Sequence, residues 1–273
     1  MKKTLLIIIS AGLLTTSACK KDSDFLDVPP KQVVTSEVAF SDPNLVLSIL
    51  GDLYNRQLDF SGLDNGWASF VDFSEAFPSE NGSYNIVQRT GWGYGEWNTW
   101  DYTYIRELNL FIQRATAATA LTEADKNRFI AEGRFLRANY YFEMVKRMGG
   151  VPLITEPLNY DFSGNVANLQ VARAKESDIY DFVISEAEAI KGLLDIGLSD
   201  KSRATKGAVL AMEARAALYA GSIAKYGVTT PQVSLPGGEV GIPSSMANAY
   251  YTKALAAAQE IISGSAEIGR AHV

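Results

Sequence analysis

Apolar residues recur at helical spacing in six stretches of the chain. The first follows the capping sequence Ser41-Asp42-Pro43 and predicts a helix over 43–59. A second pattern runs from Glu96 to Ala120, and a third, capped by Thr122 to Asp125, runs to Arg147 and stops at two glycines. The remaining patterns predict helices over 177–194, 205–226 and 247–263. Because the second and third are separated by a short break, we expect them to pack antiparallel.

Three segments between these helices lack a regular apolar pattern. Residues 61–95 are rich in Gly, Ser, Asn and Asp, residues 151–175 are mixed, and residues 227–245 are rich in Gly and Pro. Alanines in 205–226 permit close helix approach, which favours a stack of paired helices. We therefore expect a mostly α fold, a tetratricopeptide-like helical scaffold with long, aromatic-rich loops.

Composition removes several classes of function. The chain has 273 residues, 47% of them hydrophobic, which is enough to bury a sizeable core. Its net charge is −6, with no basic block in the body of the chain, so we expect no nucleic-acid partner. Cys19 and His272 are the only residues of their types, which excludes a disulfide framework, common zinc motifs and a Ser-His-Asp triad. We expect neither a cofactor nor a metal.

The N-terminus has the pattern of an export signal. Residues 1–18 combine two lysines, an apolar run and small residues, which is typical of a signal peptide. The apolar run is well short of the roughly 20 residues that a spanning helix needs. Cys19 directly follows Ser-Ala, as in a bacterial lipobox, so we predict lipidation of Cys19 and a tether over 19–34. An ordinary secreted protein with a chance cysteine is the alternative.

The C-terminal residues 267–273 have no periodicity of their own and resemble a translated sequencing adapter. We interpret them as a non-native tail, so that the folded domain covers residues 35–266.

Aromatic residues are concentrated in one part of the chain. Residues 67–104 hold eleven of them, including all four tryptophans. Aromatic planes stack on the apolar faces of sugar rings, while Asn, Asp and Arg bond the hydroxyls. We predict glycan contacts for the four aromatics that lie among Gly, Asn and Ser: Trp67, Tyr84, Trp92 and Tyr94. Packing within the loops is their alternative role. Helical spacing instead predicts core positions for Trp97, Trp100, Tyr104 and Leu108.

Charged residues offer two further hypotheses. Arg134 and Arg137 lie on one helical stripe with Tyr141, and we expect these arginines, with Arg106 and Arg114, to pair with Glu107, Glu132 or Glu143 rather than to bind an anion. A glycosidase needs two carboxylates about 5–10 Å apart. Asp72, Glu75 and Glu80 lie near the aromatics, but among 31 acidic residues such proximity is expected by chance, so we favour a protein that is not an enzyme.

Several blocks, in order, resemble the SusD/RagB family of outer-membrane nutrient-uptake lipoproteins. They are FLDVPP (25–30), EWNTWDYTYIRELN (96–109), AEGRFLRANYYF (131–142) with GGVPLITEP (149–157), and SRATKGAVLAMEARAALY (202–219). Together they cover nearly all of the chain that follows Cys19, and the third block is the most specific.

The resemblance implies a lipid-anchored protein of the outer membrane, exposed at the cell surface, that takes part in polysaccharide utilisation. Such proteins capture oligosaccharides, or in some cases peptides, and deliver them to a SusC-like TonB-dependent transporter. Family members are commonly much longer, so residues 35–266 are expected to be an incomplete N-terminal SusD-like domain. The alternative is a structural subunit that docks on the transporter, with the ligand held by a missing C-terminal half.

Overall fold

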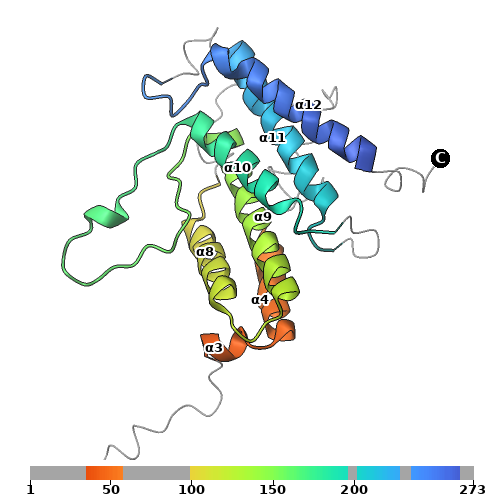
Figure 1. Cartoon of the computed structure of the whole chain (residues 1–273). Helices are drawn as coiled ribbons and strands as arrows, with labels where there is room; N and C mark the ends of the chain where they lie inside the picture. The colour runs from red at the N-terminus through yellow and green to blue at the C-terminus, as the bar shows by residue number, and fades with distance from the viewer. Residues whose placement is uncertain (1–34, 58–98, 196–201, 228–234, 265–273) are drawn as a thin grey trace, which may run out of the picture. The chain divides into compact units, whose positions relative to one another are not determined.

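The computed structural model describes residues 35–57, 99–195, 202–227 and 235–264. The chain divides into two compact units, residues 1–39 and 40–273. The first contains, in its described part, the short helix α3 (Ser36–Ala39). The second contains, in its described part, α4 (Pro43–Asn55), α8 (Tyr102–Ala117), α9 (Glu123–Met148), α10 (Glu176–Ile190), α11 (Lys206–Tyr226) and α12 (Ala247–Gly264), with 3₁₀ turns η2 (Ala167–Leu169) and η5 (Ser244–Met246) (Figure 1). The prediction of a mostly α fold is confirmed.

Capping side chains set the helix starts. Thr122 Oγ1 accepts a hydrogen bond from Asp125 N (3.1 Å) at the start of α9, as the sequence predicted, and Thr205 Oγ1 accepts one from Ala208 N (3.2 Å) at the start of α11. The bounds of α9, α11 and α12 agree with the prediction to within two residues. α4 and α10 both end four residues earlier than predicted.

The start of α8 differs from the sequence prediction. The helix begins at Tyr102 rather than at 96, because the Asp101 side chain accepts a hydrogen bond from Tyr104 N (3.0 Å) and caps it. Thr99 and Trp100 therefore precede the helix, and residues 96–98 lie outside the described residues. The helical spacing of the aromatic residues continues across this cap, so the spacing alone does not reveal that α8 begins at Tyr102.

Consecutive helices of the second unit pack against one another, α8 with α9, α9 with α10, α10 with α11, and α11 with α12, and α4 packs on α9. α8 and α9 are antiparallel, as predicted (Figure 1). Tyr104 and Leu108 of α8 are 1% and 0% exposed, so their predicted core positions are confirmed. Among the described residues, no helix has the length and apolar character needed to cross a bilayer.

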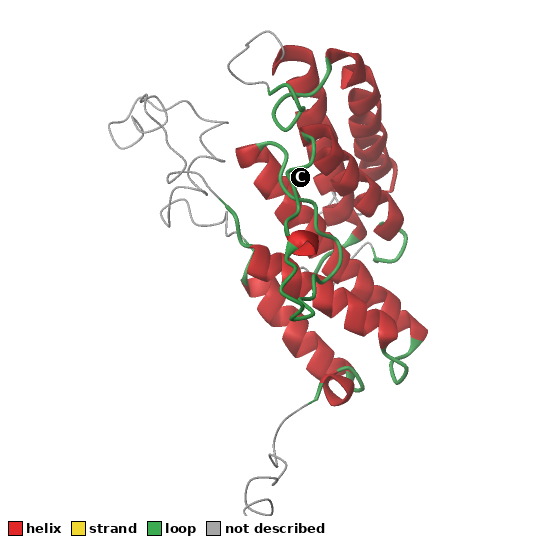
Figure 2. Ribbon diagram, turned by 90° about the vertical axis from the view of Figure 1, so that its left-hand side faces the viewer, coloured by secondary structure: helices red, strands yellow, loops and turns green. Residues whose placement is uncertain are grey.

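The segment between α9 and α10 is a loop whose ends meet. Gly149, with φ of +69°, ends α9 in a conformation that favours glycine. At Gly150 a Cβ atom would lie 2.0 Å from Ala174 O, so only glycine permits this approach. Ala174 N donates to Val151 O (3.0 Å), which closes the loop. The loop stands out beside α8 in Figure 1, and Figure 2 views it from that side.

Candidate functional site

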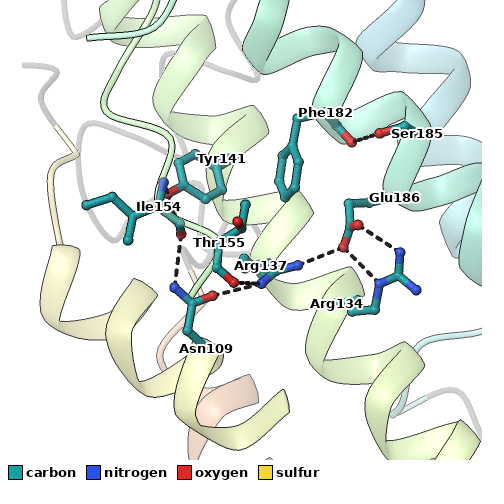
Figure 3. A network of polar contacts seen from close by, with 9 residues as sticks. All are labelled: Asn109, Arg134, Arg137, Tyr141, Ile154, Thr155, Phe182, Ser185 and Glu186. Carbon is teal, nitrogen blue, oxygen red and sulfur yellow. Dashed lines mark hydrogen bonds and ion pairs between the residues drawn. The ribbon is translucent and has the colours of Figure 1, made fainter. Parts of the chain in front are cut away.

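Side chains of α8 and α9 hold the 152–158 segment of this loop (Figure 3). The Tyr141 hydroxyl accepts a hydrogen bond from Ile154 N (2.8 Å), and Asn109 Nδ2 donates to Ile154 O (2.9 Å). Other backbone oxygens of the segment accept hydrogen bonds from the Tyr102 hydroxyl (to Pro152 O, 2.7 Å), Arg137 Nη1 (to Thr155 O, 2.7 Å) and Arg106 (to Leu158 O). Side chains of α8 and α9 thus satisfy the backbone polar groups of this segment, a role that the backbone of a neighbouring strand has in a sheet.

A charged network lies beneath this segment (Figure 3). Arg134 binds Glu186 through two hydrogen bonds, Nε to Oε2 (3.0 Å) and Nη2 to Oε1 (2.8 Å). Arg137 Nη2 donates to the same Oε2 (3.0 Å), while its Nη1 donates to Asn109 Oδ1 (2.8 Å). Burial alone would raise the pKa of Glu186, but the two arginines outweigh it and hold this pKa below its ordinary value.

The network corrects the partners predicted for Arg134 and Arg137. Pairing with carboxylates is confirmed, but the carboxylate is Glu186 of α10 for both. The glutamates predicted as partners bind other cations: Glu107 pairs with Arg56, Glu132 with Arg128 and Arg203, and Glu143 with Lys146 and Arg147. Arg106 is bound to the loop rather than to a glutamate.

An aromatic pocket of about 570 Å³ opens between the start of α8 and the loop. Its aromatic walls are Trp100, Tyr102 and Tyr160, and Arg106 and Glu156 are the charged residues of its lining. Trp100 is 39% exposed and its ring contacts that of Tyr102 at 5.4 Å, edge to face. The volume of the aromatic pocket falls in the range of about 300–1,000 Å³ typical of small-ligand sites. Exposed aromatic faces beside polar groups suit a ligand with apolar faces and hydroxyl edges.

A second, polar pocket of about 580 Å³ lies over the charged network. Gln113 and Thr116 of α8, Arg134 of α9 and Phe182 of α10 contribute to its lining. It shares Glu156 with the aromatic pocket.

Most residues proposed from the sequence lie outside the described residues. This applies to the glycan candidates Trp67, Tyr84, Trp92 and Tyr94, to the lipidation candidate Cys19, to Trp97, and to the carboxylates Asp72, Glu75 and Glu80.

The core position predicted for Trp100 is wrong. Trp100 precedes α8 and borders the aromatic pocket, because the cap at Asp101 starts the helix after it. Sequence reasoning also missed Tyr102, Arg106, Glu156 and Tyr160 as pocket residues. One signal was present in the sequence: apolar and aromatic residues such as Tyr160, Phe162 and Val171 recur in a polar loop with no helical pattern to bury them.

Comparison with known proteins places this fold in a family. Residues 24–218 match the family model described as "Starch-binding associating with outer membrane", of the SusD-like group. A SusD-like protein of Bacteroides ovatus is 29% identical over 224 residues, which are 75% of this chain and 37% of that protein.

Solved structures agree with this assignment. A SusD-like protein of Bacteroides fragilis shares 28% identity with a TM-score of 0.51, covering 70% of this chain and 37% of its own. A SusD superfamily protein of Parabacteroides distasonis shares 26% identity with a TM-score of 0.56, covering 81% of this chain and 45% of its own. The chain belongs to the SusD-like family, whose structures are helical and tetratricopeptide-like. It spans less than half the length of these relatives.

Proposed function

We propose that this protein captures oligosaccharides at the cell surface and passes them, unaltered, to a SusC-like TonB-dependent transporter of the outer membrane. The observation that carries the proposal is the aromatic pocket, where Trp100 and Tyr160 keep 39% and 38% of their surface exposed. Sugar rings bury their C–H faces on such side chains, and Arg106 and Glu156 lie within reach of hydroxyl groups at the same pocket. The family membership supports the same ligand class.

The proposal extends to residues that lie outside the described ranges. Cys19 carries the lipid that anchors the protein, and Trp67, Tyr84, Trp92 and Tyr94 add further glycan contacts. Binding without hydrolysis is supported by the lining of the aromatic pocket, where Glu156 is the one carboxylate among the described residues, whereas glycosidases use a pair. A peptide ligand and a purely transporter-docking role are the alternatives that the experiment separates.

The test is binding of the full-length protein to a panel of glycans and peptides, followed by calorimetry on the ligands found. Trp100→Ala should weaken glycan binding by about tenfold or more, as expected for an aromatic anchor. Tyr226→Ala is the matched control, since Tyr226 is an aromatic residue, 61% exposed, on α11, which does not line the pocket. Trp67→Ala and Trp92→Ala test the sequence-based candidates in the same assay.

Each part of the proposal has its own contradicting result. Glycan binding that is unchanged by all three tryptophan substitutions assigns the ligand to another part of the protein, and peptide binding alone overturns the ligand class. Newly released reducing ends indicate hydrolysis. Failure to co-purify a TonB-dependent transporter contradicts the delivery step, and palmitate labelling that persists in Cys19→Ala contradicts the anchor.

A further inference from the structure

The aromatic and polar pockets lie on the two sides of one segment, residues 152–158, which bends at Glu156. Pro152, Ile154 and Leu158 line the aromatic pocket, whereas Thr155 and Pro157 line the polar pocket. Glu156 lines both pockets and is the point where they meet.

Hydrogen bonds fix the separation between the two pockets. The segment between them is bound at Pro152 O, at both polar atoms of the Ile154 backbone and at Thr155 O, by side chains of α8 and α9. A wall held at this many points is formed before any ligand arrives, so binding across it does not require the segment to become ordered.

The polar pocket offers hydrogen-bonding groups that the fold does not use. Arg134 commits Nε and Nη2 to Glu186, and its Nη1 makes no hydrogen bond with another described residue. Gln113 and Thr116 expose their side chains along α8, and the Gln113 amide makes no hydrogen bond within the described ranges. The Thr116 hydroxyl donates to Ile112 O (2.7 Å), so its oxygen can still accept a hydrogen bond. These groups suit a ligand rich in hydroxyls.

Glu156 places a negative charge at the point where a ligand would cross between the pockets. The two linings together carry three guanidinium groups, those of Arg106, Arg134 and Arg137, and two carboxylates, those of Glu156 and Glu186, so their overall charge is close to balanced. A carboxylate on a ligand crossing at Glu156 would meet a like charge. A neutral polyhydroxyl chain meets no such repulsion.

We infer that the two pockets are successive subsites for one neutral oligosaccharide chain, which crosses the 152–158 segment at Glu156. One part of the chain stacks in the aromatic pocket, and the units beyond the crossing bond Gln113, Thr116 and Arg134. This inference rests on the proposed function and adds to it both a minimum ligand length and a preference for uncharged sugars.

The test is the dependence of affinity on ligand length. The full-length protein is titrated with neutral linear oligosaccharides of two to seven units, starting with maltose to maltoheptaose and continuing with the equivalent series from any polymer found on the panel. Affinity should rise about tenfold once the chain is long enough to cross Glu156. Gln113→Ala and Thr116→Val should each remove about threefold to fivefold of that gain while leaving disaccharide binding unchanged.

Two further variants complete the design. Gln259→Ala is the matched control for Gln113→Ala, because Gln259 is an exposed glutamine on α12, which lines neither pocket. Glu156→Gln removes the negative charge at the crossing, so the affinity for acidic oligosaccharides, such as oligogalacturonate, should rise several-fold relative to the affinity for neutral ones. Gln113 and Thr116 are exposed, so their variants should remain folded, which circular dichroism checks.

The outcomes distinguish this inference from the function on which it rests. Glycan binding that does not depend on length, or that Gln113→Ala and Thr116→Val weaken equally at every length, overturns the two-subsite arrangement and leaves the proposed function standing. Tighter binding of acidic than of neutral oligosaccharides by the wild type overturns the preference for uncharged sugars. A protein that binds no glycan at all removes the proposed function itself.

Discussion

Two buried glutamates, one beneath the pockets and one in the C-terminal helix stack, have opposite ionisation behaviour. Glu186 is 8% exposed and its pKa is lowered, so it is ionised between Arg134 and Arg137. Glu213 of α11 is 1% exposed, and burial, with a contribution from neighbouring Glu188, raises its pKa to about 8. Burial is common to both, so the partner decides the charge.

The surroundings of Glu213 explain why it has no cation. Lys191 lies between Glu188 (2.8 Å) and Glu260 (2.7 Å), and Lys206 also binds Glu260 (2.9 Å). Glu213 makes no ion pair with another described residue, and its Oε2 has no hydrogen-bond partner there. The stack of α10, α11 and α12 therefore buries an acid without a counter-ion. Beneath the pockets, Glu186 is buried with two counter-ions, Arg134 and Arg137, both of which line the polar pocket.

The largest effect is expected on removing the charge of Glu186. Glu186→Gln leaves two guanidinium groups, one of them almost fully buried, without a counter-ion, and should lower the free energy of unfolding by about 3–5 kcal/mol. Urea denaturation measures this. Glu107→Gln is the matched control, because Glu107 also pairs with an arginine but its side chain is 42% exposed, and the cost there should stay below about 1 kcal/mol. Equal losses of stability in Glu186→Gln and Glu107→Gln would contradict the distinction between a buried and an exposed ion pair.

The sequence could predict the helices but not the pockets, for a physical reason. Helix caps and apolar spacing are local, so α9 and α11 were placed to within two residues. The bond from Tyr102 to Pro152 and that from Arg137 to Glu186 join residues about fifty positions apart, and no local pattern specifies which partners meet. Trp100 was misplaced for a related reason: its helical spacing to Tyr104 is real, yet the cap at Asp101 separates the two residues structurally.

A medium effect, and one that depends on pH, is expected at Glu213. Its pKa is higher in the folded than in the unfolded chain, so the folded state binds the extra proton and stability is lost as pH rises from about 4.5 to about 8. At about 1.4 kcal/mol for each tenfold change in proton affinity, the full shift corresponds to about 5 kcal/mol, and the lowered pKa of the neighbouring Glu188 offsets part of it, so the loss should be on the order of 2 kcal/mol. Glu213→Gln should remove this slope in denaturation midpoints measured from pH 5 to pH 9.

The control for that slope is Asp161→Asn. Hydrogen bonds from Ser163 lower the pKa of Asp161, an exposed residue of the loop between α9 and α10, so its titration falls below this pH range and its variant should keep the wild-type slope. Glu186 titrates on the same acidic side, since stability from a lowered pKa is present above about 4.5 and is lost as pH falls further. A slope that survives in Glu213→Gln would place the responsible proton on another group.

The smallest effect is expected in the loop between α9 and α10, at Phe162. This residue adopts a φ of +58° and has 87% of its surface exposed. Phe162→Gly removes the strain of this conformation but also the ring contact with Tyr160 at 5.0 Å, so the two changes should cancel to within about 0.5 kcal/mol. The same substitution at Leu218, an apolar residue that is 50% exposed inside α11, should cost about 1 kcal/mol, because glycine is unfavourable in a helix interior. Urea denaturation of both variants measures the difference, and equal costs would show that the backbone at Phe162 is not strained.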